Sequence, residues 1–223
     1  IIYIYMFSNT FNINDKFNLV TYNKCGSTQI IKLLSVYYNY FTKHNHSFHN
    51  NSCNKYNLIR TCAANMLNNE INNSNITYFI IRKHNYRILS YYLSNYNGNL
   101  SFEDFVNNLI NNKINHNNHL NSYFDTYTLQ KFKKIKIIQL NNLNQFFLDK
   151  FSMSINNTKI ENSSSNFFNT YNKNIEIYKI NKNKLKEFNF SRENFFNKKI
   201  NTDINNFYSF DINLIKNYNT LFK

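Results

Sequence analysis

The sequence predicts an α/β fold with a central parallel sheet flanked by helices. Three short apolar runs typical of β-strands lie at residues 17–22, 76–81 and 135–140, and helix-like apolar spacing follows each one. The run at 76–81 (ITYFII) contains no charge, as expected of a strand that is covered on both faces. Strands that alternate with helices favour parallel connections. Because 223 residues are enough for one sizeable core and do not require a second domain, we expect a single domain.

Each predicted strand leads into a predicted helix. The strand at 17–22 (FNLVTY) passes through the turn NKCGST into a helix whose apolar face comprises Ile30, Leu33, Leu34, Tyr37 and Phe41. The second strand precedes a helix that carries on one face Tyr86, Leu89, Leu93 and Tyr96. Behind it, Ser101 and Asp104 form a capping-box pattern that predicts the start of another helix. The third strand precedes a helix with Leu143, Phe146 and Phe147, and a last helix is predicted from Asp211 onward.

The remaining segments carry little pattern. Residues 1–16 are predicted to be peripheral, and residues 156–174 are polar without a clear period, which is typical of a surface loop. No apolar stretch approaches the roughly 18 to 20 residues needed to cross a bilayer, and the opening residues lack a basic lead and a small-residue cleavage pattern. The chain starts with Ile rather than Met, which leaves open an upstream piece.

Composition limits the classes of protein. Hydrophobic residues make up 42% and aromatic residues 18% of the chain, which argues against disorder throughout. Cys25, Cys53 and Cys62 fit neither a disulfide framework nor a zinc site, so we expect reduced thiols. The formal net charge of +14 indicates an anionic partner, such as nucleic acid, a membrane surface, a polyanionic glycan or a phosphorylated cofactor. An AT-biased genome would also enrich lysine, so the charge alone selects none of these.

The turn after the first strand has the composition of a phosphate-binding loop. Gly26, one of only two glycines, lies in the stretch Lys24-Cys25-Gly26-Ser27-Thr28 between a strand and a helix. Backbone N–H groups at such a helix start point toward an anion, and Lys24 adds a positive charge. The nucleotide-triphosphatase pattern GxxxxGK[ST] is absent, because the lysine precedes the glycine. A capped helix start without any ligand remains the alternative.

A second cationic motif begins at the end of the second strand. Two of the chain's four arginines, Arg82 and Arg87, lie five residues apart, and Ser90 follows three residues later. Arginine is suited to forked binding of a phosphate, and a serine hydroxyl can complete the contacts. Two arginines and a serine at the end of a strand are therefore a second candidate phosphate site.

The two motifs together resemble those of the sulfotransferase superfamily. Arg82, Arg87 and Ser90 match its R-x-P-x-x-R-x-x-S stretch, with His84 where proline is usual. Further segments are similar to the family in order and spacing, namely residues 101–106 (SFEDFV), 116–123 (HNNHLNSY), 137–147 and 204–214 (INNFYSFDINL). The resemblance therefore spans most of the chain from about residue 18.

The resemblance implies a P-loop-like three-layer sandwich and an enzyme that needs no metal. This enzyme would move a sulfonyl group from 3′-phosphoadenosine 5′-phosphosulfate to a hydroxyl of a carbohydrate or of another acceptor, polyanionic acceptors included. Lys24 would be catalytic, beside the leaving phosphate oxygen. The resemblance further implies that the 5′-phosphate contacts the loop residues Lys24, Cys25, Gly26, Ser27 and Thr28. The resemblance implies that Arg82 and Ser90 hold the 3′-phosphate. Arg87 would either join them or only stabilise the helix.

The acceptor hydroxyl also needs a general base, for which the resemblance indicates the segment after the first helix. His46 and His49 are the preferred catalytic candidates, with His44 and Glu70 behind them. The histidines of this segment lack Cys or carboxylate partners at ligand spacing, which argues against a metal site. His116 and His119 are assigned to the rim of the acceptor site.

Two other classes of protein remain open. A small-molecule kinase would need an acidic residue to hold Mg²⁺ near the loop, whereas the second strand ends in Arg-Lys-His. A nucleic-acid-binding module would use the net charge and the many Tyr and Phe side chains, but no such signature is present, so we expect no nucleic acid partner. The compartment stays open between the cytoplasm and, if an anchor precedes the chain, the Golgi lumen. The oligomeric state stays open as well.

Overall fold

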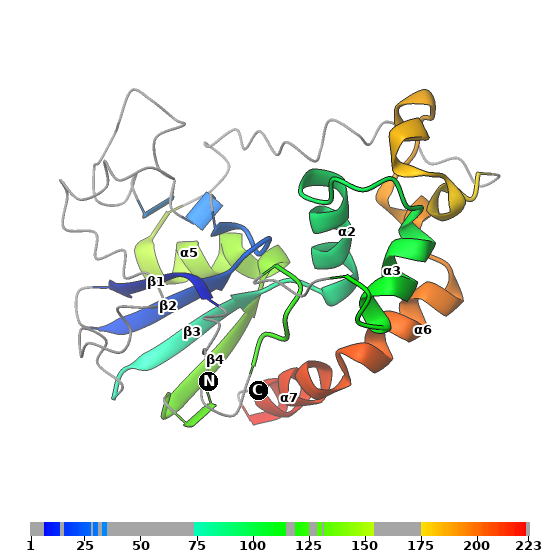
Figure 1. The fold of residues 1–223 in the computed structure, drawn as a ribbon. Helices are drawn as coiled ribbons and strands as arrows, with labels where there is room; N and C mark the ends of the chain where they lie inside the picture. The colour runs from blue at the N-terminus through cyan, green and yellow to red at the C-terminus, as the bar shows by residue number, and fades with distance from the viewer. Residues whose placement is uncertain are drawn as a thin grey trace. The chain divides into compact units, whose positions relative to one another are not determined.

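The computed structural model describes residues 7–13, 16–27, 29–30, 33–34, 74–114, 119–124, 129–130, 132–153 and 175–221 (Figure 1). These residues gather in two compact units. Unit 1 takes in Ile1–Arg82, Ser122–Lys159 and Leu214–Lys223, and unit 2 takes in Lys83–Asn121 and Ile160–Asn213. Each unit contains its own cluster of buried apolar side chains. That the chain forms a single domain stays a prediction, and the predicted loop at 156–174 lies outside the described residues.

Unit 1 is built on a four-stranded mixed sheet. Its strands, in spatial order, are β1 (Phe7–Ile13), β2 (Phe17–Tyr22), β3 (Ile76–Ile81) and β4 (Lys134–Gln139). The strands β2, β3 and β4 are parallel, whereas β1 pairs with β2 in antiparallel fashion. The α/β class is therefore confirmed, and the sheet is mixed rather than purely parallel.

The antiparallel strand lies in the segment 1–16 that was predicted to be peripheral. It is the edge strand of the sheet, and its pairing with β2 has a register shift between Phe7 and Asn9. Since β1 ends at Ile13 and β2 begins at Phe17, three residues separate them, and the Lys16 N–H donates to Ile13 O at 2.9 Å. A link this short joins only antiparallel strands, because a parallel crossover needs a dozen residues or so.

Helices cover both faces of this sheet within unit 1 (Figure 1). The helix α5 (Leu143–Phe151) follows β4 and the 3-10 helix η4 (Leu140–Asn142). It packs on one face of the sheet, where the ring centroid of Phe146 lies 5.0 Å from that of Tyr78. Phe79 lies on the opposite face and belongs to the buried apolar cluster of unit 1. The part of α7 (Ser209–Leu221) that belongs to unit 1 packs against this cluster. Because both faces are covered, β3 is buried at every position except its first, as its uncharged sequence predicts.

Unit 2 is mainly helical in its described residues. It contains α2 (His84–Ser94), α3 (Phe102–Ile110), α6 (Lys198–Phe207) and the 3-10 helices η7 (Ile177–Lys179), η8 (Lys182–Glu187) and η9 (Arg192–Phe195). The predicted start of α3 is confirmed, because the Ser101 side chain accepts the Asp104 N–H at 3.1 Å. The core of unit 2 is rich in aromatic side chains that meet edge to face, as Phe102 and Phe195 do with ring centroids 5.5 Å apart.

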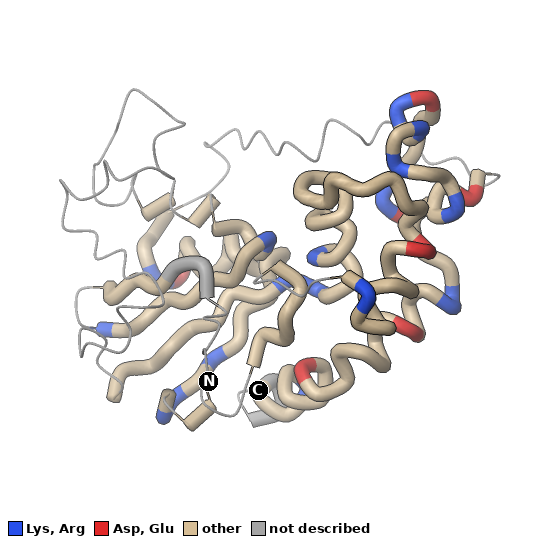
Figure 2. Tube along the Cα trace, viewed as in Figure 1, with Lys and Arg blue, Asp and Glu red and all other residues tan. Residues whose placement is uncertain are grey.

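The charges of the described residues are spread over both units. Lys and Arg occur in each unit, and Asp and Glu lie among them along the helices of unit 2 (Figure 2). Each described helix is too short or too polar to cross a membrane.

Candidate functional site

The turn after β2 leads directly into a helix, as its sequence predicts. The Cys25 N–H donates to Tyr22 O at 3.1 Å and closes a turn at the end of the strand. The Ile30 N–H donates to Gly26 O at 3.0 Å and begins the helix. Lys24 has a φ of 63° and Gly26 a φ of 80°, so two left-handed residues bend the chain between strand and helix. A positive φ is uncommon for lysine, because its Cβ crowds the following carbonyl.

Arg82 lies beside this turn, at the carboxyl ends of the parallel strands. The parallel register pairs Thr21 with Ile80, so its continuation by two residues brings Arg82 beside Asn23. The Arg82 guanidinium donates from Nη1 to Lys24 O at 3.5 Å. Lys24 and Arg82, which are 58 residues apart in the chain, therefore lie at the carboxyl ends of two neighbouring strands.

Two positive charges share this edge of the sheet. Lys24 and Arg82 are both partly buried. Burial lowers the pKa of Lys24, and the positive charge of Arg82 lowers this pKa further. An anion that contacts both side chains would be favoured here, because its charge offsets their mutual repulsion and the loss of hydration.

Gly26 has two structural reasons to be glycine. Its φ of 80° is strained for any residue with a Cβ. A Cβ built at this position would lie 2.5 Å from Cδ1 of Leu140, the first residue of η4 (Leu140–Asn142), so the Leu140 side chain fills the space. Both reasons are local to the fold, and the glycine alone therefore does not identify an anion site.

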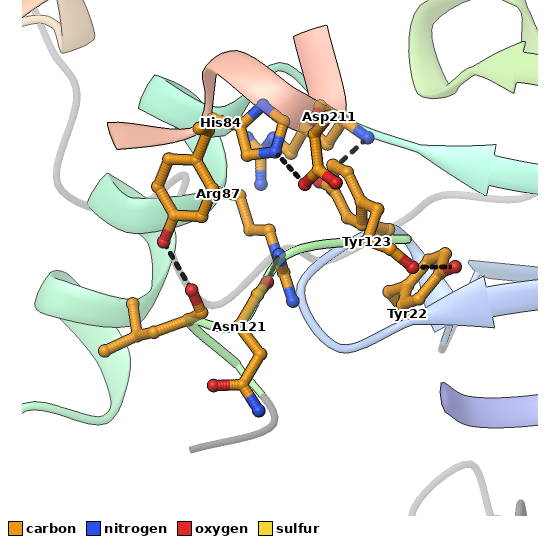
Figure 3. A network of polar contacts seen from close by, with 10 residues as sticks. Tyr22, His84, Arg87, Asn121, Tyr123 and Asp211 are labelled. Carbon is orange, nitrogen blue, oxygen red and sulfur yellow. Dashed lines mark hydrogen bonds and ion pairs between the residues drawn. The ribbon is translucent and has the colours of Figure 1, made fainter. Parts of the chain in front are cut away.

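Tyr123 connects the turn to the end of β3. It is the last residue of the stretch 116–123 that resembles the family, but no role was predicted for it. Its side chain is fully buried. The Tyr123 hydroxyl accepts the Arg82 N–H at 3.2 Å, donates to Arg82 O at 2.7 Å and lies 3.1 Å from Cys25 Sγ. The Tyr22 hydroxyl donates in turn to Tyr123 O (Figure 3). A single tyrosine within a polar segment has no recognisable pattern, so only the tertiary contacts reveal its position.

Arg87 and Ser90, the other residues of the second motif, lie on α2 in unit 2. Arg87 is 1% exposed, and its Nη1 donates to Asn121 O at 2.5 Å (Figure 3). Ser90 is partly buried, and its carbonyl accepts the Ser94 hydroxyl at 2.6 Å. The Asn121 carbonyl satisfies one of the N–H donors of this buried guanidinium.

His84 forms a buried pair with Asp211 in the same unit. The distance from His84 Nε2 to Asp211 Oδ2 is 2.8 Å (Figure 3). The ring of Tyr208 stacks on the imidazole at a centroid distance of 4.3 Å. Burial lowers the pKa of His84, the contact with Asp211 opposes this shift, and the charge of Arg87 adds to it. His84 stands where the resemblance has proline, and no sequence pattern indicated this pair.

Several predicted site residues lie outside the described residues, namely Thr28, His44, His46, His49, Glu70 and His116. His119 is described, and its ring centroid lies 5.5 Å from that of Tyr91 within unit 2. In the described ranges, no three His, Cys, Asp or Glu side chains gather where they could hold a metal ion. Cys25 is buried and forms no disulfide.

Comparison of the chain with protein-family models, curated proteins and solved structures found no match. The chemistry of the site therefore has to be inferred from its geometry. Open α/β sheets bind ligands beyond the carboxyl ends of their parallel strands, and Lys24 and Arg82 occupy this position in unit 1. The arrangement is suited to bind an anion.

Proposed function

We propose that the chain is a sulfotransferase that moves a sulfonyl group from 3′-phosphoadenosine 5′-phosphosulfate to a hydroxyl, most simply one of a carbohydrate. The observation that carries the proposal is the meeting of Lys24 and Arg82 at the ends of β2 and β3. Each residue belongs to a stretch that resembles a phosphate-binding stretch of the sulfotransferase superfamily. Neither stretch by itself requires the other to lie nearby, so their meeting supports a shared ligand.

The donor groups of this site fit a phosphorylated nucleotide. Lys24 offers an ammonium group, Arg82 offers a planar guanidinium that can bind two phosphate oxygens, and the helix start at Gly26 and Ser27 offers backbone N–H groups. When bound, the cofactor supplies a sulfonyl group whose transfer leaves negative charge on a phosphate oxygen. Lys24 and the N–H groups of the loop stabilise this charge electrostatically.

The remaining assignments extend the proposal beyond this site. The fold would be a P-loop-like three-layer sandwich, and His46 or His49 would accept the proton of the acceptor hydroxyl. Contacts of Arg87 and Ser90 with the 3′-phosphate stay predictions from the sequence.

Calorimetric titration with adenosine 3′,5′-bisphosphate in EDTA tests the proposal. We expect the intact protein to bind, and we expect Lys24→Ala and Arg82→Ala each to weaken binding by about tenfold or more, since charge-assisted contacts to phosphate are lost. Lys134→Ala is the matched control, because Lys134 is exposed at the first position of β4, the opposite end of the parallel strands. Unchanged affinity in both site variants would rule out this binding site.

Competing ligands distinguish the classes of function. Adenosine 5′-phosphate lacks the 3′-phosphate, and we expect it to bind about tenfold more weakly than the bisphosphate. Tighter binding of ATP with Mg²⁺ would indicate a kinase, and tighter binding of a single-stranded oligonucleotide would indicate a nucleic-acid-binding module. Transfer of radioactive sulfate from the cofactor to a glycan, lost in Lys24→Ala, would establish the reaction itself.

A further inference from the structure

The Tyr123 hydroxyl has a complete set of hydrogen-bond partners. A phenol offers one O–H donor and two acceptor lone pairs. Its proton goes to Arg82 O at 2.7 Å, and one lone pair accepts the Arg82 N–H at 3.2 Å. Because the only proton is used in this way, the contact of 3.1 Å with Cys25 Sγ makes the thiol S–H the donor. One hydroxyl thus binds the residue at the end of β3 and a residue of the turn after β2.

These contacts act on the backbone beside both cations. The residue whose N–H and C=O groups Tyr123 binds is the one that carries the Arg82 guanidinium. Cys25 directly follows Lys24, and its N–H is bonded to Tyr22 O. The Tyr22 hydroxyl then returns to Tyr123 O, which closes the set of contacts around the two strand ends. Tyr123 therefore contacts the backbone beside both Lys24 and Arg82.

The aromatic ring of Tyr123 makes a separate contribution. It packs in the unit 1 core, with centroid distances of 4.8 Å to Tyr22 and 6.4 Å to Phe124. Phenylalanine at this position would keep the ring contacts and remove only the hydroxyl. The two contributions can therefore be separated by a single substitution.

We propose that Tyr123 is a positioning residue of the anion site. Its hydroxyl holds Arg82 and the turn containing Lys24 together, and so sets the spacing of the two cations that bind a phosphate group. The identity of the phosphorylated ligand rests on the proposed function, whereas the spacing of the cations does not.

Titration of Lys24 in the full chain tests this positioning without any ligand. Acylation of Lys24 is measured across a pH series by mass spectrometry of its peptide. In the intact protein, burial and Arg82 hold the pKa of Lys24 below its ordinary value. In Tyr123→Phe, we expect this pKa to rise toward the ordinary value, because the turn moves away from Arg82 and becomes more hydrated. A Lys24 titration identical to that of the intact protein would overturn the proposal.

A second measurement is the affinity for adenosine 3′,5′-bisphosphate, which we expect to fall about tenfold in Tyr123→Phe. Tyr92→Phe is the matched control, because the Tyr92 hydroxyl donates to Leu100 O at 2.8 Å in unit 2 and loses a bond of the same kind. We expect it to change neither the affinity nor the Lys24 titration, and an equal shift in both variants would show general destabilisation instead. If the intact protein binds no bisphosphate, the proposed function fails, while the Lys24 titration still decides the role of Tyr123.

Discussion

Lys24 has a backbone conformation that favours glycine, which predicts an unusual order of stability among its variants. Glycine in a helix or strand is less stable than alanine by roughly 0.5–1 kcal/mol, because the unfolded chain gains freedom. At the φ of 63° found for Lys24, a residue with a Cβ instead bears roughly 1–2 kcal/mol of strain that glycine lacks. We therefore expect Lys24→Gly to be more stable than Lys24→Ala by about 0.5–1 kcal/mol.

The comparison isolates the backbone. Both variants remove the same ammonium group and its repulsion with Arg82, so charge does not enter the difference. Urea unfolding gives the free energies, and the two melting temperatures should differ by about 1–4 °C for a chain of this size. If Lys24→Gly is instead the less stable variant by the ordinary margin, the argument from the positive φ is refuted.

The same pair of variants bears on function. We expect neither variant to retain the affinity for adenosine 3′,5′-bisphosphate, because both lack the Lys24 ammonium group. A Lys24→Gly protein that is more stable than the intact protein but no longer binds the bisphosphate would show that Lys24 serves the ligand and destabilises the fold. Strained backbone at binding sites commonly has this origin.

Three further predictions concern single residues. Gly26→Ala should lower the free energy of unfolding by about 2 kcal/mol, because the new Cβ is strained at this φ and lies 2.5 Å from Leu140 Cδ1. In a Leu140→Ala background, which removes this contact, the loss should be only about 1 kcal/mol. A double-mutant cycle by urea unfolding measures both values. Stability should fall as the pH drops below 6.5, because the folded-state pKa of His84 is below this ordinary value and the unfolded chain takes up the proton first; urea midpoints of His84→Gln should show a flatter dependence on pH. Ser101→Ala should cost about 1 kcal/mol in the same assay through the lost bond to the Asp104 N–H, and an unchanged midpoint would contradict the cap.

Local signals in the sequence predicted most of the described elements of the sheet. The runs at 17–22 and 76–81 coincide with β2 and β3. The run at 135–140 overlaps β4 (Lys134–Gln139) but is shifted by one residue toward the C-terminus. Apolar runs and caps involve side chains and backbone a few residues apart, so they can be recognised without the fold. The strand β1 escaped prediction because its sequence, FSNTFNI, alternates polar and apolar residues too weakly to stand out. Its antiparallel pairing made the sheet mixed.

The order of strand, turn and helix, the placement of Lys24 in the turn and the placement of Arg82 after β3 follow from the sequence alone, because they depend only on spacing along the chain. Only the tertiary structure decided that Arg82 contacts Lys24 O, that one hydroxyl of Tyr123 binds both Arg82 and Cys25, and that His84 pairs with a residue 127 positions away. Such contacts join segments that the packing of the core brings together, and no local pattern of residues specifies the distance between them.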